Sequence, residues 1–161
     1  VQDNISFGQS EAADTDETLQ QALQLSQAAE FVDRYPEKAA HPIAQLGRNV
    51  SGGQKQRLSI ARALARTPEI LIFDDSFSAL DYKTDATLRE GLAKQLPGTT
   101  KIIVAQRIST IRHADQILVL DRGEIAGLGT HDALMASCPV YREIAMSQLS
   151  EEELKKGGAS K

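Results

Sequence analysis

Four residues at positions 51–54 have the types and the spacing of a helix start that binds an anion. Ser51 can cap a helix, and Gly52, Gly53 and Gln54 follow it at the head of a strong helical pattern. Glycines let a ligand approach the backbone closely, and the first N–H groups of a helix carry a partial positive charge. A plain serine cap with a glycine turn explains these four residues equally well. Taken alone, they leave a phosphate site and a structural turn equally open.

A second chemical feature is the carboxylate pair Asp74-Asp75, which follows the apolar run 70–73. If that run is a buried strand, the two carboxylates lie at its C-terminal edge, where open α/β sheets bind their ligands. A lone apolar strand that ends in Asp-Asp is more often a turn. The pair therefore gains meaning only from its position after the glycine-rich helix start.

The elements that must position these residues follow from hydrophobic periodicity. A long helix is predicted from Ser51 to Arg66, because Leu58, Ala61 and Leu64 lie near one face and Pro68 ends it. Further elements are predicted as strands at 70–73 and 101–105 and a helix at 81–95. Short apolar runs that alternate with helices indicate parallel strands joined by crossovers, so the fold class is α/β.

The rest of the chain is predicted with less regular signals. Asp3-Asn4 and Gly8 indicate turns near the start. Other expected elements are an amphipathic helix at 14–25, a short helix at 27–34, a loop at 39–49, strands at 116–120 and 124–127 around a turn at 121–123, and helices from 131 and at 139–149. The polar tail at 150–161 is expected to be disordered.

Composition excludes several classes of protein. A chain of 161 residues with 41% hydrophobic and 25% charged residues fits one globular domain. The net charge of -4 argues against a nucleic-acid partner, because such binding needs a basic surface. Cys138 is the only cysteine and no signal peptide is visible, so a reducing, cytosolic setting is expected. No apolar run reaches the roughly 18 residues that span a bilayer. The three histidines lack metal-ligand spacing and are expected at the surface or at caps.

The run from Ser51 to Arg57, followed by Ile60-Ala61-Arg62-Ala63-Leu64, resembles the signature motif of the ATP-binding cassette (ABC) family. The resemblance implies a P-loop ATPase fold with a helical signature subdomain and a mostly parallel sheet. It also implies that residues 51–54 contact the γ-phosphate of ATP held by a second ABC ATPase domain. Val50 stands where the family usually has leucine, which is a mild change.

Residues 70–75 resemble the family's Walker B strand. The resemblance implies that Asp74 holds Mg²⁺, directly or through water, since hard cations favour oxygen ligands. The family normally has glutamate at the next position to polarise the attacking water, and this chain has Asp75. The missing methylene withdraws the carboxylate by roughly an ångström, and such a misplacement can lower a rate about a hundredfold. Slow hydrolysis is expected at this site.

Two further segments resemble family motifs. Ser78 and Asp81 match the D-loop, which implies a place at the dimer interface, although a helix cap explains them too. Residues 102–107 resemble the switch strand, but Gln106 stands where the family has histidine. Glutamine can donate a hydrogen bond to a phosphate oxygen, yet it cannot carry a proton near neutral pH. Both Asp75 and Gln106 would act on this domain's own nucleotide, and both depart from the family pattern.

The resemblance covers residues 1–149, divided as a signature subdomain at about 10–66 and part of the catalytic core at about 67–149. The phosphate-binding pattern Gly-x-x-x-x-Gly-Lys (Walker A) does not occur in the sequence. We therefore expect a portion of a domain that, alone, binds ATP weakly or not at all and is inactive.

Among cassette proteins, the favoured hypothesis is the degenerate half of a heterodimeric exporter at the cytoplasmic face of a membrane. Its partners would be a second ATPase domain and a transmembrane domain. A soluble cassette protein that clamps ribosomes or DNA is the alternative, and paired membrane segments in the full-length protein would exclude it. A third possibility is an interaction module without a nucleotide role.

Overall fold

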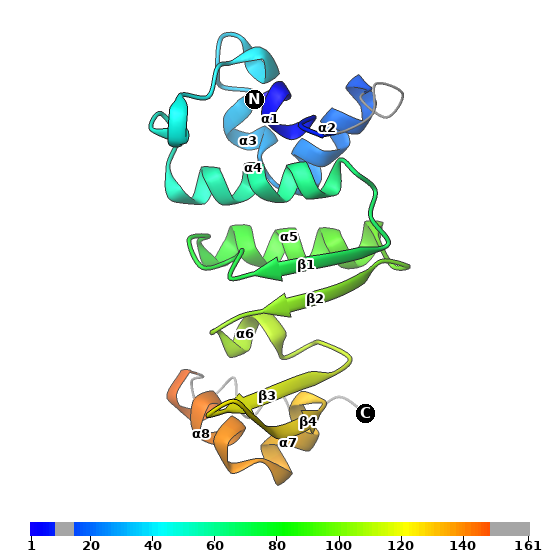
Figure 1. The fold of residues 1–161 in the computed structure, drawn as a ribbon, viewed down its shortest axis with the longest axis vertical. Coiled ribbons are helices and arrows are strands. Elements are labelled where there is room, and N and C mark those ends of the chain that lie inside the picture. Colours follow the sequence, from blue (N-terminus) through cyan, green and yellow to red (C-terminus); the bar gives the residue numbers. More distant parts are fainter. Residues whose placement is uncertain (9–14, 149–161) are drawn as a thin grey trace. The chain divides into compact units, whose positions relative to one another are not determined.

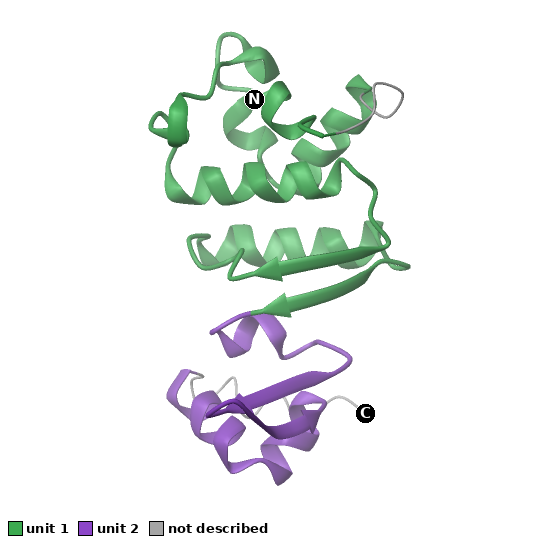
Figure 2. Cartoon of the chain, viewed as in Figure 1, with its two compact units in different colours: residues 1–104 green, residues 105–161 purple. Residues whose placement is uncertain are grey.

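The computed structural model describes residues 1–8 and 15–148, which form two compact units. Unit 1 comprises residues 1–104 and unit 2 begins at Ala105 (Figure 2). Each unit buries its own cluster of apolar side chains. The predicted tail at 150–161 lies outside the described residues.

Unit 1 is mostly helical before its first strand (Figure 1). Its elements in chain order are α1 (Gln2–Ile5), α2 (Asp16–Leu25), α3 (Ala29–Val32), the 3-10 turns η1 (Lys38–Ala40) and η2 (Gln45–Gly47), α4 (Gly52–Leu64), β1 (Ile70–Asp74), α5 (Tyr82–Gln95) and β2 (Thr100–Val104). The long helices begin where polar caps predict them. Thr15 caps α2, Ser51 caps α4 and Asp81 caps α5, each by accepting a backbone N–H.

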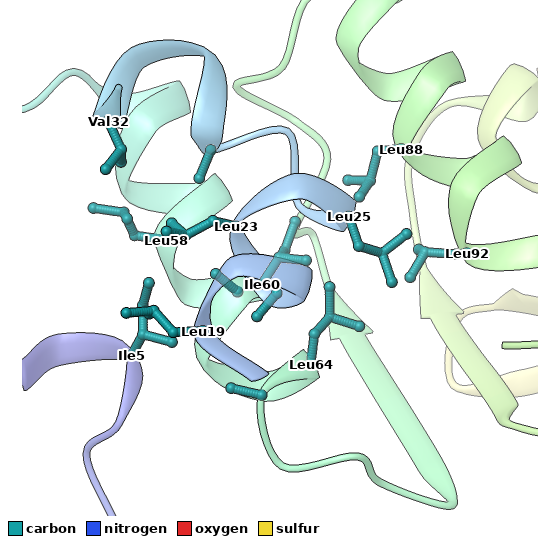
Figure 3. Packing of buried hydrophobic residues seen from close by; sticks show 14 of the residues in the cluster. Ile5, Leu19, Leu23, Leu25, Val32, Leu58, Ile60, Leu64, Leu88 and Leu92 are labelled. Carbon is teal, nitrogen blue, oxygen red and sulfur yellow. The ribbon is translucent and has the colours of Figure 1, made fainter. Parts of the chain in front are cut away.

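The core of unit 1 lies between α2 and α4 and continues to α5. Leu23 and Leu58 pack together, and Leu25 of α2 reaches Leu88 and Leu92 of α5 (Figure 3). Arg57 of α4, on the charged face of the helix, packs against neighbouring residues. Arg57 donates to the carbonyl of Gln27 at 2.9 Å and forms an ion pair with Glu30, and its guanidinium lies over the ring of Phe31. Arg57 therefore links α4 to α3 and to the residues just before it.

The strands of unit 1 confirm the predicted parallel pairing. β1 and β2 run parallel, with Ile72 opposite Ile102 and Asp74 opposite Val104. Burial alternates along β1: Leu71 and Phe73 face the core, whereas Ile70 and Ile72 are exposed. The strand is therefore buried on one face only, which corrects the expectation of a buried strand. This order delivers the carboxyl end of β1 directly into the loop that precedes α5.

Unit 2 combines a hairpin with helices. Its elements are α6 (Ile108–Ile111), β3 (Ile117–Asp121), β4 (Glu124–Gly129), α7 (His131–Ser137) and α8 (Pro139–Gln148). Arg122 and Gly123 both have positive φ, 50° and 84°, as a two-residue turn of type I′ requires. The hairpin and helices enclose a core that includes Leu134, Cys138 and Tyr141.

The structure corrects two further expectations and adds one element that was not predicted. The segment around Asp3 forms helix α1 instead of a turn, and α6 follows β2 where no element was predicted. His131 is buried, whereas a surface or capping place was expected. Its Nδ1 lies 2.8 Å from the hydroxyl of Tyr141, and burial lowers the pKa of the imidazole.

Among the described residues, no helix is both long and apolar enough to cross a bilayer.

Candidate nucleotide site

The start of α4 is a capping box with two donors left over. The Ser51 N–H donates to Oε1 of Gln54 at 2.8 Å, and the Gln54 N–H donates to Oγ of Ser51 at 3.3 Å. First-turn amides have no partner within a helix, and no described residue accepts from those of Gly52 and Gly53. These two amides, with the Ser51 hydroxyl, can therefore bind an anion at a helix N-terminus.

The two glycines have different surroundings. A Cβ on Gly52 would lie 3.8 Å from the Cβ of Ala79, which is ordinary contact. A Cβ on Gly53 would lie 2.9 Å from the carbonyl oxygen of Ala79, which is too close. Gly53 is thus required for packing against the loop before α5, whereas a side chain at Gly52 would make only ordinary contact.

The predicted carboxylates lie side by side at the end of β1. Asp74 is the last residue of the strand, and both Asp74 and Asp75 are exposed. The Asp75 N–H donates to the carbonyl of Val104 at 3.1 Å, which extends the parallel ladder by one residue. Asp75 itself has φ of 48°, in the left-handed region that aspartate tolerates better than most residues. The chain therefore turns sharply at the residue that replaces the family's glutamate.

Ser78 and Asp81 make different contacts in the segment between β1 and α5. The Ser78 hydroxyl donates to the Asp75 carbonyl at 3.0 Å, so this residue belongs to the turn beside the carboxylates. Asp81 accepts the Thr84 N–H at 2.9 Å and the Thr84 hydroxyl at 2.7 Å. These hydrogen bonds, first the one from the backbone N–H, lower the pKa of Asp81. Its carboxylate acts here as the cap of α5.

Gln106 belongs to unit 2 and is exposed there. Its carbonyl accepts Nε2 of Gln148 at 2.8 Å, and Oε1 of the same side chain accepts the Ile108 N–H at 2.9 Å. Helix α8 thereby holds the backbone around Gln106 and leaves its side chain exposed. Neither this contact nor the residue Gln148 was singled out by the sequence.

Sequence reasoning also missed Gln56. Its Nε2 donates to the carbonyl of Asp75 at 3.2 Å and to Oγ of Ser78 at 3.1 Å, and its Oε1 accepts the Ala79 N–H at 2.9 Å. A signal was present, because Gln56 lies on the helix stripe of Gly53 and Ile60, where a polar residue needs partners.

Comparison with known proteins settles the family. The ABC transporter family profile matches residues 1–78. An uncharacterized ABC transporter ATP-binding protein of Mycobacterium tuberculosis is 45% identical over 92% of this chain. A bacterial Atm1-family ABC exporter, solved with ATP bound, superposes on 93% of the chain with a TM-score of 0.87 and 35% identity. The chain is part of an ABC transporter ATP-binding domain. The ABC ATPase fold predicted from the signature motif is therefore confirmed.

The chain also resembles a protein with a named activity. An ATP-dependent lipid A-core flippase of Xanthomonas oryzae is 38% identical over 95% of the chain. The chain spans 26% of that relative, 25% of the mycobacterial protein and 26% of the Atm1-family exporter. These matches establish family and fold, and the roles of individual residues stay predictions.

The donor set of this ABC domain fits Mg²⁺ and a triphosphate. Amides and a hydroxyl at the start of α4 suit a phosphate, and the exposed oxygens of Asp74 suit a hard cation. No group of three or more His, Cys, Asp or Glu residues gathers among the described residues. A magnesium ion that is bound by one or two carboxylates and by substrate phosphates does not need such a group.

Proposed function

We propose that this chain is part of the nucleotide-binding domain of an ABC exporter, in which two ATPase domains bind ATP at their interface and hydrolysis drives transport. The observation that carries the proposal is the start of α4. There, the amides of Gly52 and Gly53 have no acceptor among the described residues, and together with the Ser51 hydroxyl they can bind an anion. The likeness to a bacterial exporter solved with ATP bound supports it.

Each site residue then has a role. Ser51, Gly52, Gly53 and Gln54 bind the γ-phosphate of ATP that the partner domain holds. Asp74 holds Mg²⁺, which supplies charge neutralisation at the phosphate oxygens. Asp75 orients water at this chain's own nucleotide, and Gln106 donates a hydrogen bond to its γ-phosphate. Ser78 and Asp81 run along the dimer interface.

This chain's own site hydrolyses ATP slowly in the proposal. Asp75 has a shorter side chain than glutamate and Gln106 cannot carry a proton, so two contributions to catalysis are weakened together. The signature residues at 51–54 are intact because they serve the other site. This asymmetry favours a heterodimer in which the partner's site performs most of the hydrolysis.

The full-length protein would include or bind a transmembrane domain, and the ATPase domain would lie at the cytoplasmic face of the membrane. The proposed domain covers 1–149, with the signature subdomain at about 10–66 and part of the core at about 67–149. Because the chain's sequence contains no Gly-x-x-x-x-Gly-Lys pattern, the 161-residue chain alone would be inactive. A soluble clamp is not favoured, since the relatives named above are a transporter protein and a flippase.

The proposal is tested by single-turnover ATP hydrolysis in the full-length complex, with the nucleotide counted at each of the two sites. We expect one site that stays occupied and turns over slowly beside one fast site. Two equally fast sites would show that Asp75 and Gln106 are competent substitutes and would refute the asymmetry. Absence of ATP binding at both sites would refute the proposed function as a whole.

A further inference from the structure

The side chain of Gln56 bridges helix α4 and the loop after β1. It makes all three of its contacts with that loop: it donates to the Asp75 carbonyl and to Ser78 Oγ, and it accepts from the Ala79 N–H. The contacts therefore use both the amide NH₂ and the amide oxygen. Glutamate has no donor to offer and methionine offers neither group, so glutamine is the residue that this geometry requires.

The carbonyl oxygen of Asp75 accepts several hydrogen bonds. Besides Nε2 of Gln56, it accepts the Ser78 hydroxyl at 3.0 Å and the Ser78 N–H at 3.3 Å. The N–H of Asp75 is held by Val104 on the other side. A residue other than glycine keeps a left-handed backbone conformation only where its surroundings hold it there. These hydrogen bonds hold Asp75 at φ 48°. Of the residues that make these hydrogen bonds with Asp75, Gln56 is the one that belongs to helix α4.

Helix α4 also touches the same loop through Gly53, whose missing Cβ admits the Ala79 carbonyl. Gly53 lies two residues after the capping Ser51, at the helix start assigned to the partner's nucleotide. One helix therefore carries a group for the partner's site and holds the loop that carries Asp75.

We propose that Gln56 is a positioning residue for hydrolysis: it fixes the backbone of Asp75, and so aims this carboxylate at the chain's own nucleotide. This inference rests on the proposed function and deepens it. The side chain of Gln56 is bound to the loop after β1, so its effect on hydrolysis passes through Asp75. It also couples the loop to the helix whose start binds the partner's nucleotide.

The test uses Gln56→Met and Gln56→Glu in the full-length complex, with single-turnover hydrolysis measured at this chain's own site. We expect both variants to be about tenfold slower, within the loss that follows a misplacement of roughly an ångström. The Kd for ATP should stay within about twofold, because the proposal gives Gln56 no part in binding the nucleotide. The matched control is Gln21→Met on the exposed side of α2, where only a 3.3 Å hydrogen bond to Glu17 is lost. It should leave the rate unchanged.

A double-mutant cycle separates positioning from general loosening of the fold. Asp75→Asn removes the carboxylate and keeps a residue that tolerates positive φ. If Gln56 acts through Asp75, adding Gln56→Met to Asp75→Asn should slow hydrolysis less than about twofold further. Rates that multiply, or a Gln56→Met rate equal to that of the unaltered complex, would overturn the proposal while leaving the proposed function intact.

The remaining outcomes are also decisive. If Asp75→Asn itself leaves the own-site rate unchanged, the proposed function of that site is wrong and the role of Gln56 falls with it. If Gln56→Met does not fold, Gln56→Glu carries the test alone, because it retains the acceptor for Ala79 and loses only the donors to Asp75 and Ser78.

Discussion

Asp75 combines an unusual backbone with a short side chain. At φ 48°, an aspartate is tolerated better than a glutamate, because its short polar side chain can form local hydrogen bonds. Aspartate therefore suits the sharp turn after β1, but its carboxylate extends less far toward a nucleotide than that of glutamate. Residue identity alone shows the missing methylene, whereas the conformation explains how the chain accommodates aspartate there.

At this scale the test is restoration of the family residues. The double replacement Asp75→Glu with Gln106→His is expected to raise single-turnover hydrolysis at this chain's own site by about tenfold or more, since it restores reach and a group that can carry a proton. The measurement is the per-site rate in the full-length complex, with each single variant as its control. An unchanged rate would show that residues outside these two positions also slow the site.

Helix α4 shows how one element meets two demands. Its start must expose amides to a ligand, and its inner face must pack against the loop that carries Asp75. Gly52 and Gly53 divide these demands, because only Gly53 lies against the Ala79 carbonyl. Two glycines that look equivalent in the sequence are therefore expected to respond differently to the same substitution.

Replacement by alanine tests this division. Gly53→Ala forces a Cβ to within 2.9 Å of the Ala79 oxygen, and overpacking of this kind costs about 1 to 3 kcal/mol of unfolding free energy. Gly52→Ala meets its nearest atom at 3.8 Å and should change the unfolding free energy by no more than about 0.5 kcal/mol. Urea unfolding of the two variants beside the unaltered chain gives both values. Equal losses would contradict the packing role of Gly53.

Each unit of the molecule leaves an apolar sheet face open. In unit 1, the exposed side chains are Ile70 (58%), Ile72 (68%), Ile102 (49%) and Val104 (54%). In unit 2, they are Leu118 (52%), Leu120 (62%), Ile125 (68%) and Leu128 (62%). Among the described residues, each sheet has two strands. Contiguous apolar surface on a soluble protein promotes association.

The chain by itself is therefore expected to self-associate as its concentration rises. Ile72 and Ile102 are cross-strand partners, and replacing both by threonine keeps the β preference while removing apolar surface. Sedimentation velocity should show a smaller associated fraction for the double variant. The control is Leu46→Asn, which removes an apolar side chain that is 77% exposed and lies outside the strands, and asparagine tolerates the positive φ of 61° at this position. A monomeric unaltered chain, or an equal effect of the control, would contradict the expectation.

Much of the element pattern could be predicted because its causes are local. The caps Ser51 and Asp81 and Pro68 mark helix limits through contacts within a few residues. The alternation of short apolar runs with helices was enough to predict parallel pairing of β1 and β2. Helix α1 was missed because it is a single turn without a side-chain cap, and α6 because a four-residue element has almost no periodicity.

The sequence by itself determined the family, the long elements and the two altered positions, since motif identity and periodicity belong to neighbouring residues. Only the tertiary structure decided which side chains meet. Gln56 lies 19 residues before Asp75 in the chain, and their contact exists because α4 packs beside the loop after β1. The burial of His131 against Tyr141 depends in the same way on how α7 and α8 pack. Such contacts are set by packing between elements, which no local pattern specifies.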